Sequence, residues 1–188
     1  MEIESLDFIN TQYTDQLLAL LRENVFHVTT AKAYGEILKD EFIFGNQDDK
    51  YPINTGSLKS FGRYRGWVCL FDLRGKSDKE IDDALMSYNF LGPGWFKEHF
   101  QNYTESRLVY LIMSKAYCDH LMPNREGRKS QDDGLGFTQY IPNVECWFPG
   151  DMPIGLIGKV ICVRIRNSVL KDDTLLYAHH MLALEENQ

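Results

Sequence analysis

Four short apolar runs constrain the fold of this 188-residue chain more than any other feature. They are rich in β-branched and aromatic residues, and they lie at Trp67–Leu73, Arg107–Met113, Val144–Phe148 and Lys159–Ile165. Runs of this length and composition predict buried strands. Helical patterns do not alternate strictly with these strands, as they would in a doubly wound parallel sheet. The chain is therefore predicted to belong to the α+β class.

Local signals predict helices and short strands between these runs. Leucines spaced by three and four residues predict a helix over Thr14–Glu23, and Val25–Val28 is predicted to be a short strand. Thr29 or Thr30 is expected to cap the helix that follows this strand. Further elements are expected at Phe42–Phe44 (extended), from Ser77 with Glu80 through Tyr88 (a helix opened by a capping box), at Ala116–Leu121 (a short helix) and from Asp172 on (a helix).

Two long polar segments, residues 45–66 and 124–143, are expected to be loops. Loops of this length in a compact domain are usually functional or disordered. The connection over residues 149–158 has room for one helical turn. Because no repeat, low-complexity tract or linker divides the chain, a single domain over residues 1–188 is predicted.

Composition argues against membrane, disulfide and metal proteins. The chain is 44% hydrophobic and 13% aromatic, which is enough for a packed core. No apolar run approaches the roughly 20 residues of a membrane helix, and the amino terminus is acidic, so no membrane partner and a cytoplasmic location are expected. Cysteines without CxxC spacing are expected to be reduced core residues, with no metal bound; they are Cys69, Cys118, Cys146 and Cys162.

The net charge of −7 disfavours a protein that coats nucleic acid through a broad basic face. Basic residues nevertheless concentrate in two segments. The first holds Lys59, Arg63, Arg65, Arg74 and Lys76, and the second holds Arg125, Arg128 and Lys129. The sequence therefore does not exclude a local basic groove.

The sequence FHVTT holds the first candidate site. The chain has no Walker loop, GxGxxG, HExxH or GxSxG motif, so the site must be found from other patterns. His27 and Thr29 are expected on one face of a strand, where a ring nitrogen and a hydroxyl can hydrogen-bond the carboxamide or ribose of a ligand. The alternative is an ordinary strand histidine beside a helix cap.

The second candidate is Glu145, set among apolar residues in NVECWFPGD. Alternation along the strand places it on the same face as Trp147, and a tryptophan there suits the lining of a cleft. A partly desolvated carboxylate in such a cleft stabilises positive charge that develops in a transition state. The alternative is an outward-facing glutamate.

Arginines supply the third candidate. Arg63, Arg65 and Arg74 flank the strand that begins at Trp67, and an arginine fork binds a pyrophosphate through two parallel hydrogen bonds. The alternative for each arginine is a solvated salt bridge to a nearby acid.

The order of FHVTT, AYGEILKDEFI and the late segment IPNVECWFPGDMPIGLIGKVICVRI resembles bacterial ADP-ribosyltransferase-fold proteins, nearest the DarT-like nucleic-acid-modifying toxins. EILKDEFI is similar to the family pattern "IL.DG.I", with Glu41 where glycine is common. Downstream of the glutamate, the proline turn, the apolar pair and the last strand follow in the family's order, as Pro149, Pro153, Ile154, Ile157 and the strand of Val160. The resemblance covers about residues 25–165, and it implies two small packed β-sheets flanked by short helices.

The resemblance also implies roles. NAD would be the substrate, His27 and Thr29 would bind it, and Glu145 would be the catalytic carboxylate. An arginine after the first helix takes part in the family, and the nearest candidates are Arg65 for catalysis and Arg63 for NAD binding. The loop before Glu145 would help to recognise the target. The family's central serine or tyrosine motif is not visible in WVCLFDLRG.

The implied reaction is transfer of ADP-ribose to a macromolecular acceptor, with DNA, RNA and protein all open. Cleavage of the nicotinamide–ribose bond passes through an oxocarbenium-like state that a carboxylate stabilises. If nucleic acid is the acceptor, Arg125 to Lys129 would contact phosphates. A toxin or defence role, with an antitoxin or other partner protein, follows from the resemblance alone.

Two other functions remain open. The same fold serves an NAD glycohydrolase or a degenerate domain that binds a nucleotide or partner without turnover. An unrelated α+β interaction protein would instead use its aromatic segments FLGPGWFKEHF and GFTQYIPN, since interface centres favour aromatic residues.

Overall fold

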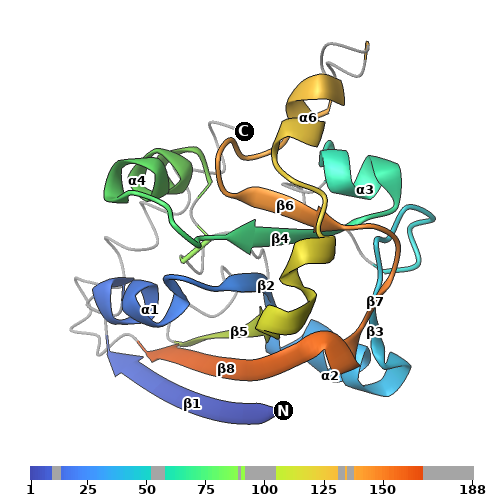
Figure 1. Cartoon of the computed structure of the whole chain (residues 1–188). Helices are drawn as coiled ribbons and strands as arrows, with labels where there is room; N and C mark the ends of the chain where they lie inside the picture. The colour runs from blue at the N-terminus through green and yellow to red at the C-terminus, as the bar shows by residue number, and fades with distance from the viewer. Residues whose placement is uncertain are drawn as a thin grey trace.

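A computed structural model describes residues 1–9, 14–51, 58–88, 90–91, 105–130, 134 and 138–166 (Figure 1). Within them, strands and short helices are mixed, which confirms the predicted α+β class. The large sheet contains, in spatial order, β1 (Glu2–Ile9), β8 (Ile157–Arg166), β5 (Glu105–Met113), β2 (Val25–Thr30), β4 (Val68–Asp72) and β6 (Glu145–Phe148). The small sheet pairs β3 (Phe42–Ile43) with β7 (Met152–Pro153).

Seven helical segments surround these sheets in the described part of the chain. The α-helices are α1 (Thr14–Leu21), α2 (Ala31–Asp40), α3 (Phe61–Arg65), α4 (Asp78–Ser87) and α6 (Arg125–Ser130), and the 3-10 turns are η3 (Lys115–His120) and η5 (Ile154–Leu156). Local sequence explains two of their starts. The Thr30 hydroxyl accepts a hydrogen bond from the Ala33 N–H at 3.0 Å and caps α2, and Ser77 with Glu80 forms the predicted capping box of α4.

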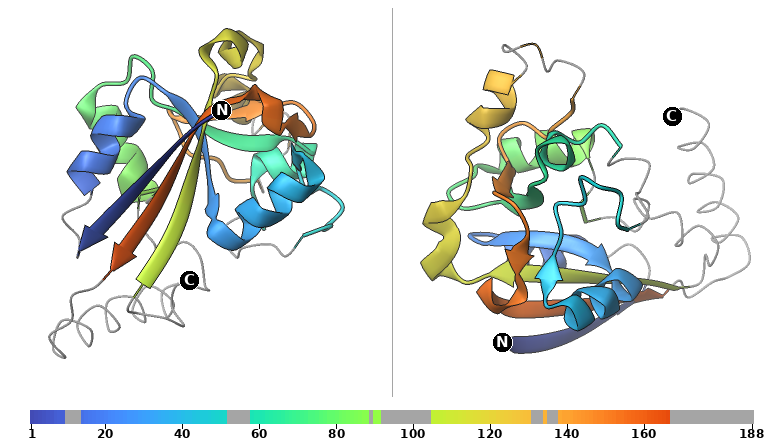
Figure 2. Two further views of the ribbon diagram at one scale, coloured as in Figure 1. Left: turned by 90° about the horizontal axis from the view of Figure 1, so that it is seen from below. Right: turned by 90° about the vertical axis from the view of Figure 1, so that its right-hand side faces the viewer.

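The large sheet has a narrow waist between β2 and β4. Only two registered pairs join these strands, Val25 with Asp72 and Phe26 with Phe71. By contrast, β5 pairs with β8 along its whole length, and β1 runs parallel to β8. In the left view of Figure 2, β4 runs across the common direction of β1, β8 and β5. The sheet is therefore made of two parts that meet over a few residues.

An aromatic cluster fills one face of the sheet at this waist. The rings of Phe26 and Phe71 stack with centroids 5.5 Å apart, and the Phe90 ring lies 4.8 Å from that of Phe71. The Tyr110 hydroxyl donates to the Phe90 carbonyl at 3.1 Å, so this buried polar group is satisfied. Helices α1 and α4 cover the same face, with Leu17 and other apolar residues in one core. The aromatic cluster and the two helices thus form one core on this side of the waist.

A second core fills the opposite face. It contains Leu70, Val109, Leu111 and Cys146 from the sheet, with Tyr34 and Ile37 of α2 packed against it. The small sheet and η3 contribute Ile43, Met152 and Cys118. Side chains on successive residues of a strand alternate between the two cores, as the period of two requires.

The sequence predicted most of these elements and missed four. The predicted strands and the helices beginning at Thr14 and Ser77 are confirmed. Strands β1 and β7 were not predicted, and the supposed loops 45–66 and 124–143 contain α3 and α6. The expectation of two small sheets differs from the structure, because the β2–β4 pairs join six strands into one sheet. The predicted helix after Asp172 and most of FLGPGWFKEHF lie outside the described residues.

Candidate functional site

Glu145 lies at the start of β6, where its side chain is buried and fully hydrogen-bonded. The residue is 5% exposed. One carboxylate oxygen accepts the Ile141 N–H at 2.6 Å and the other accepts the Trp147 indole N–H at 3.0 Å. The alternative of an outward-facing glutamate is therefore wrong. Trp147 shares this face, as predicted, but it is completely buried.

Burial changes the acidity of Glu145. Removal of the carboxylate from water raises its pKa to about 7, and the hydrogen bonds from Ile141, Cys69 and Trp147 oppose this shift. Since one ionisation state is as populated as the other near this pH, small changes in the surroundings decide whether the group is charged. Such a perturbed carboxyl group is typical of catalytic sites, and it also occurs in structural networks.

Two helices press against the Trp147 indole through glycine. A Cβ atom at Gly62 of α3 would lie 2.6 Å from Trp147 Cδ1, and one at Gly127 of α6 would lie 2.9 Å from Trp147 Cη2. The Phe61 ring packs edge-on against the indole with centroids 4.8 Å apart, and the Tyr140 ring lies at 6.2 Å. These contacts fix the indole and with it one of the two donors to Glu145.

Cys69 of β4 lies beside Glu145 and Trp147, its registered partner on β6. Its thiol lies 3.2 Å from the Ser60 hydroxyl, and the Glu145 carboxylate and the Trp147 indole are close enough to influence its pKa. Burial, followed by the charge of Glu145, raises the pKa of the Cys69 thiol far above its ordinary range. The protonated thiol is therefore a packing and hydrogen-bonding group, and it is unsuited to be a nucleophile.

His27 reaches the same residue from the other side. Its Nδ1 lies 2.9 Å from the Cys69 carbonyl oxygen, beyond the last registered pair of β2 and β4. Burial lowers the pKa of His27, and the hydrogen bond to Cys69 opposes that shift, so the ring is neutral at physiological pH. Because a carbonyl only accepts, Nδ1 carries the proton and Nε2 is an acceptor.

The strand register decides which predicted residues share a face. His27 pairs with Leu111 and Thr29 with Val109 on β5, so His27 and Thr29 share a face, as predicted. Glu145 pairs with Phe71, which pairs with Phe26, so Glu145 belongs to the other face. His27 and Glu145 therefore meet only through Cys69, whose carbonyl faces one and whose thiol faces the other.

The candidate arginines lie farther out. Arg63 forms an ion pair with Asp49 and donates to the Leu58 carbonyl at 3.3 Å. The Arg65 guanidinium is exposed and lies over the Phe61 and Trp67 rings, 5.6 and 5.7 Å from their centroids. Among the described residues, neither arginine has a hydrogen bond or ion pair with Glu145 or His27, so their assignments stay predictions.

Arg74 forms an ion pair with Asp72, donating at 2.9 and 2.7 Å. This is the ordinary salt bridge that was the alternative for this arginine.

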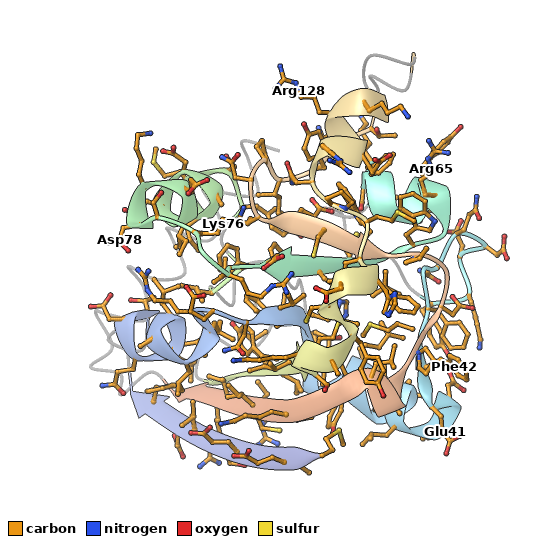
Figure 3. The ribbon with its side chains drawn as sticks, in the orientation of Figure 1. Glu41, Phe42, Arg65, Lys76, Asp78 and Arg128 are labelled. Atoms are coloured by element: carbon orange, nitrogen blue, oxygen red, sulfur yellow. The ribbon has the colours of Figure 1, made fainter. Side chains whose placement is uncertain are left out.

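Parts of the two basic segments lie on α3 and α6, which both pack on Trp147. Arg65 of α3 and Arg128 of α6 both project outward from the molecule in Figure 3. We call the outer sides of these two helices, with the adjoining Lys59, the α3–α6 basic surface; its exposed cations are Lys59, Arg65, Arg125, Arg128 and Lys129. None of the five forms an ion pair with any residue that the structure describes.

Sequence reasoning missed the polar contacts of Cys69, which lies beside Glu145. Cys69 was recognised only as an apolar core residue, and Ser60 was placed in a loop. Cys69 and Phe71 are two residues apart on β4, so their side chains share a face. The thiol therefore lies beside any residue that pairs with Phe71, and this spacing was the available signal. The pairing of β4 with β6 was not readable from either strand alone.

Comparison of the chain with protein-family models, with curated proteins and with solved structures finds no match. The functional argument therefore rests on the residues and their geometry. In the described part of the chain, no group of three or more His, Cys, Asp or Glu side chains is placed to hold a metal ion. All four cysteines are free thiols. None of the described helices has the length and apolarity to cross a bilayer.

Gly62→Ala is expected to destabilise the protein, because the new methyl group would lie 2.5 Å from Cys69 Sγ and 2.6 Å from the Trp147 ring. We expect a loss of about 1–3 kcal/mol in the free energy of unfolding, measured with urea. Gly35→Ala in α2 is the matched control, since a Cβ there meets nothing within 4 Å. It should raise stability by about 0.5–1 kcal/mol. Equal effects of the two changes would contradict the packing described for Trp147.

Ionisation of Glu145 should make stability depend on pH. Its pKa is raised from 4.5 to about 7 in the folded protein, so its stabilising contribution is present below pH 4.5 and is lost as the pH rises to 7. Between pH 5 and pH 8, the wild type should lose up to about 3 kcal/mol relative to Glu145→Gln, whose residue 145 does not titrate. Urea unfolding of both proteins measures this.

The difference in the free energy of unfolding between wild type and Glu145→Gln serves as its own control. His27 also titrates, but its contribution is common to both proteins and cancels. A constant difference between wild type and Glu145→Gln at the two pH values would show that the carboxyl group does not titrate in this range.

Proposed function

We propose that this chain is a mono-ADP-ribosyltransferase that consumes NAD, with Glu145 as its catalytic carboxylate and a nucleic acid as its acceptor. The observation that carries the proposal is the meeting of His27 and Glu145 at Cys69. These two residues are far apart in the sequence, and each is a polar residue within an apolar strand. They lie on the outer two of three neighbouring strands, β2, β4 and β6.

Glu145 supplies the chemistry of the proposal. Loss of nicotinamide leaves positive charge on the ribose, and a carboxylate next to that charge lowers the barrier most when water is excluded. Glu145 is buried and has a pKa of about 7, which suits this task. The same carboxylate can accept a hydrogen bond from a ribose hydroxyl and orient the attacking group. For this, a hydrogen bond from the substrate must replace the one that the Ile141 N–H or the Trp147 indole N–H donates to the carboxylate.

His27 supplies the binding half of the proposal. Its neutral ring presents Nε2 as an acceptor, which fits an amide N–H of nicotinamide or a ribose hydroxyl. We place NAD across the end of the β2–β4 ladder, just past Phe26 and Phe71, because His27 and Glu145 flank this point.

The order of elements supports an ADP-ribosyltransferase-like fold. The opening strand β2 bears His27, α2 follows it directly, and the late strand β6 bears Glu145. The proline-containing turn, β7 and η5 then lead into the last strand, β8. This succession is the one on which the resemblance to DarT-like proteins rests.

The α3–α6 basic surface supports a nucleic acid as the acceptor. Five cations without ion pairs in the described region stand on a protein of net charge −7, so the surface attracts a polyanion locally while the rest of the molecule repels it. The same two helices hold Trp147 beside Glu145. An acceptor bound on this surface would therefore lie close to the proposed reaction centre.

The first experiment measures nicotinamide release from NAD by mass spectrometry. The wild type should release nicotinamide, and Glu145→Gln should lose at least about 100-fold in rate, because the developing charge loses its carboxylate. Glu80→Gln, which changes the partly exposed capping glutamate of α4, is the matched control and should keep the wild-type rate. Absence of NAD binding and release in the wild type, with and without acceptors, would sink the proposal and favour a partner-binding domain.

The acceptor is tested with DNA, RNA and protein substrates by their gain of ADP-ribose. Reversing Arg125, Arg128 and Lys129 to Glu should reduce modification of a single-stranded oligonucleotide at least about tenfold at about 0.1 M salt, because phosphate contacts are lost. Release of nicotinamide without acceptor should not change. The control reverses three cations elsewhere, Lys32, Lys39 and Lys115. If free ADP-ribose is the product in the presence of every acceptor, the protein is instead an NAD glycohydrolase.

A further inference from the structure

The side chain of Asn124 makes three hydrogen bonds to a single turn. Its amide nitrogen donates to the carbonyl oxygens of Ile141 at 2.9 Å and Glu145 at 2.8 Å. Its amide oxygen accepts the Asn143 N–H at 3.1 Å. One side chain therefore holds the first, third and last residues of the segment 141–145.

This turn presents the donor that holds the Glu145 carboxylate. The Ile141 N–H donates to the carboxylate at 2.6 Å, and the Glu145 N–H donates back to the Ile141 carbonyl at 3.2 Å. Asn143 has a positive φ of 68°, a conformation that asparagine tolerates and that needs support from its surroundings. The Asn124 amide supplies this support from outside the turn.

Only an amide fits this position. The two carbonyls need donors and the Asn143 N–H needs an acceptor, and a primary amide offers both at one end of a short side chain. An aspartate of the same shape has no donor when ionised and would face two carbonyl oxygens. The arrangement is therefore specific to Asn124, and bulk packing does not explain it.

We propose that Asn124 is the positioning residue of Glu145, holding the turn 141–145 closed so that the carboxylate keeps its place in the site. That this placement serves catalysis rests on the proposed function, whereas the placement itself does not. Asn124 directly precedes α6, and its own carbonyl accepts the Gly127 N–H at 3.1 Å. A shift of α6 when an acceptor binds would thus reach the carboxylate through one side chain.

The test follows two N–H resonances by ¹⁵N NMR during a pH titration. In the wild type, the Ile141 amide and the Trp147 indole both donate to Glu145 and should shift together with a midpoint near 7. In Asn124→Ala the Ile141 amide should lose this titration and exchange with solvent at least about tenfold faster, because its partner is no longer held. The Trp147 indole should still titrate, which shows that the protein remains folded.

Asn24→Ala is the matched control. The Asn24 amide also donates to two carbonyl oxygens, those of Leu20 at 3.1 Å and Arg22 at 2.9 Å, but it contacts no part of the turn. The Ile141 amide should be unchanged in this variant. Asn124→Asp, which keeps the shape of the side chain, provides a second variant if Asn124→Ala does not fold. Unchanged Ile141 titration and exchange in a folded Asn124 variant would overturn the proposal.

Turnover adds a separate readout. If Asn124 positions the catalytic group, its variants should lower kcat for nicotinamide release about tenfold or more with little change in KM, while Asn24→Ala should retain both. Failure of the wild type to turn over NAD would remove the proposed function and leave the NMR result intact. Normal kcat in a variant with a released Ile141 amide would show that Asn124 holds the turn without serving catalysis.

Discussion

A carboxylate that has been taken out of water must be met by donors, and around Glu145 this requirement organises a large part of the molecule. Unpaired burial of such a charge would cost several kcal/mol, so each oxygen has its own N–H donor. One donor belongs to a main-chain turn and the other to a tryptophan. The turn is held by Asn124, and the tryptophan is held by two helices that approach it through glycine.

The same requirement links stability to function. The hydrogen bonds to Glu145 hold its neighbours in place. A catalytic carboxylate must instead exchange one of these partners for its substrate. Its pKa of about 7 indicates that burial outweighs the hydrogen bonds that favour the charged form. The narrow waist between β2 and β4 lies next to this group, since Phe71 pairs with both Phe26 and Glu145. A site at the point where main-chain pairing stops can admit a ligand without breaking a long ladder.

Sequence reasoning predicted the elements whose signals are local. The apolar runs at Trp67 and Arg107 are strands, and the Ser77 capping box opens α4, because alternation and capping act over a few residues. Strand β1 was missed because its sequence, EIESLDFI, is strongly charged for a strand and is paired on one side alone in the sheet. Helices α3 and α6 were missed because they are short and basic, and tertiary packing on Trp147 stabilises them more than their own propensity does.

The candidate site was predictable by residue but not by geometry. His27 and Glu145 stood out because each is polar within an apolar strand. Their separation onto different faces, and the role of Cys69 between them, depends on the register of three strands that are distant in sequence. The burial of Glu145 likewise required knowledge of the turn at Ile141. The arginines could not be assigned from sequence because salt bridges and ligand contacts use the same residues.

The most direct test of the account is an NMR titration of the protein with NAD that follows the His27 ring and the Trp147 indole N–H. NAD bound across the end of the β2–β4 ladder must perturb both groups, and we predict that the two signals shift with one common, saturable dependence on NAD concentration. Saturable shifts confined to residues remote from Cys69, or no shift at all at millimolar NAD, would contradict the placement of the site between His27 and Glu145.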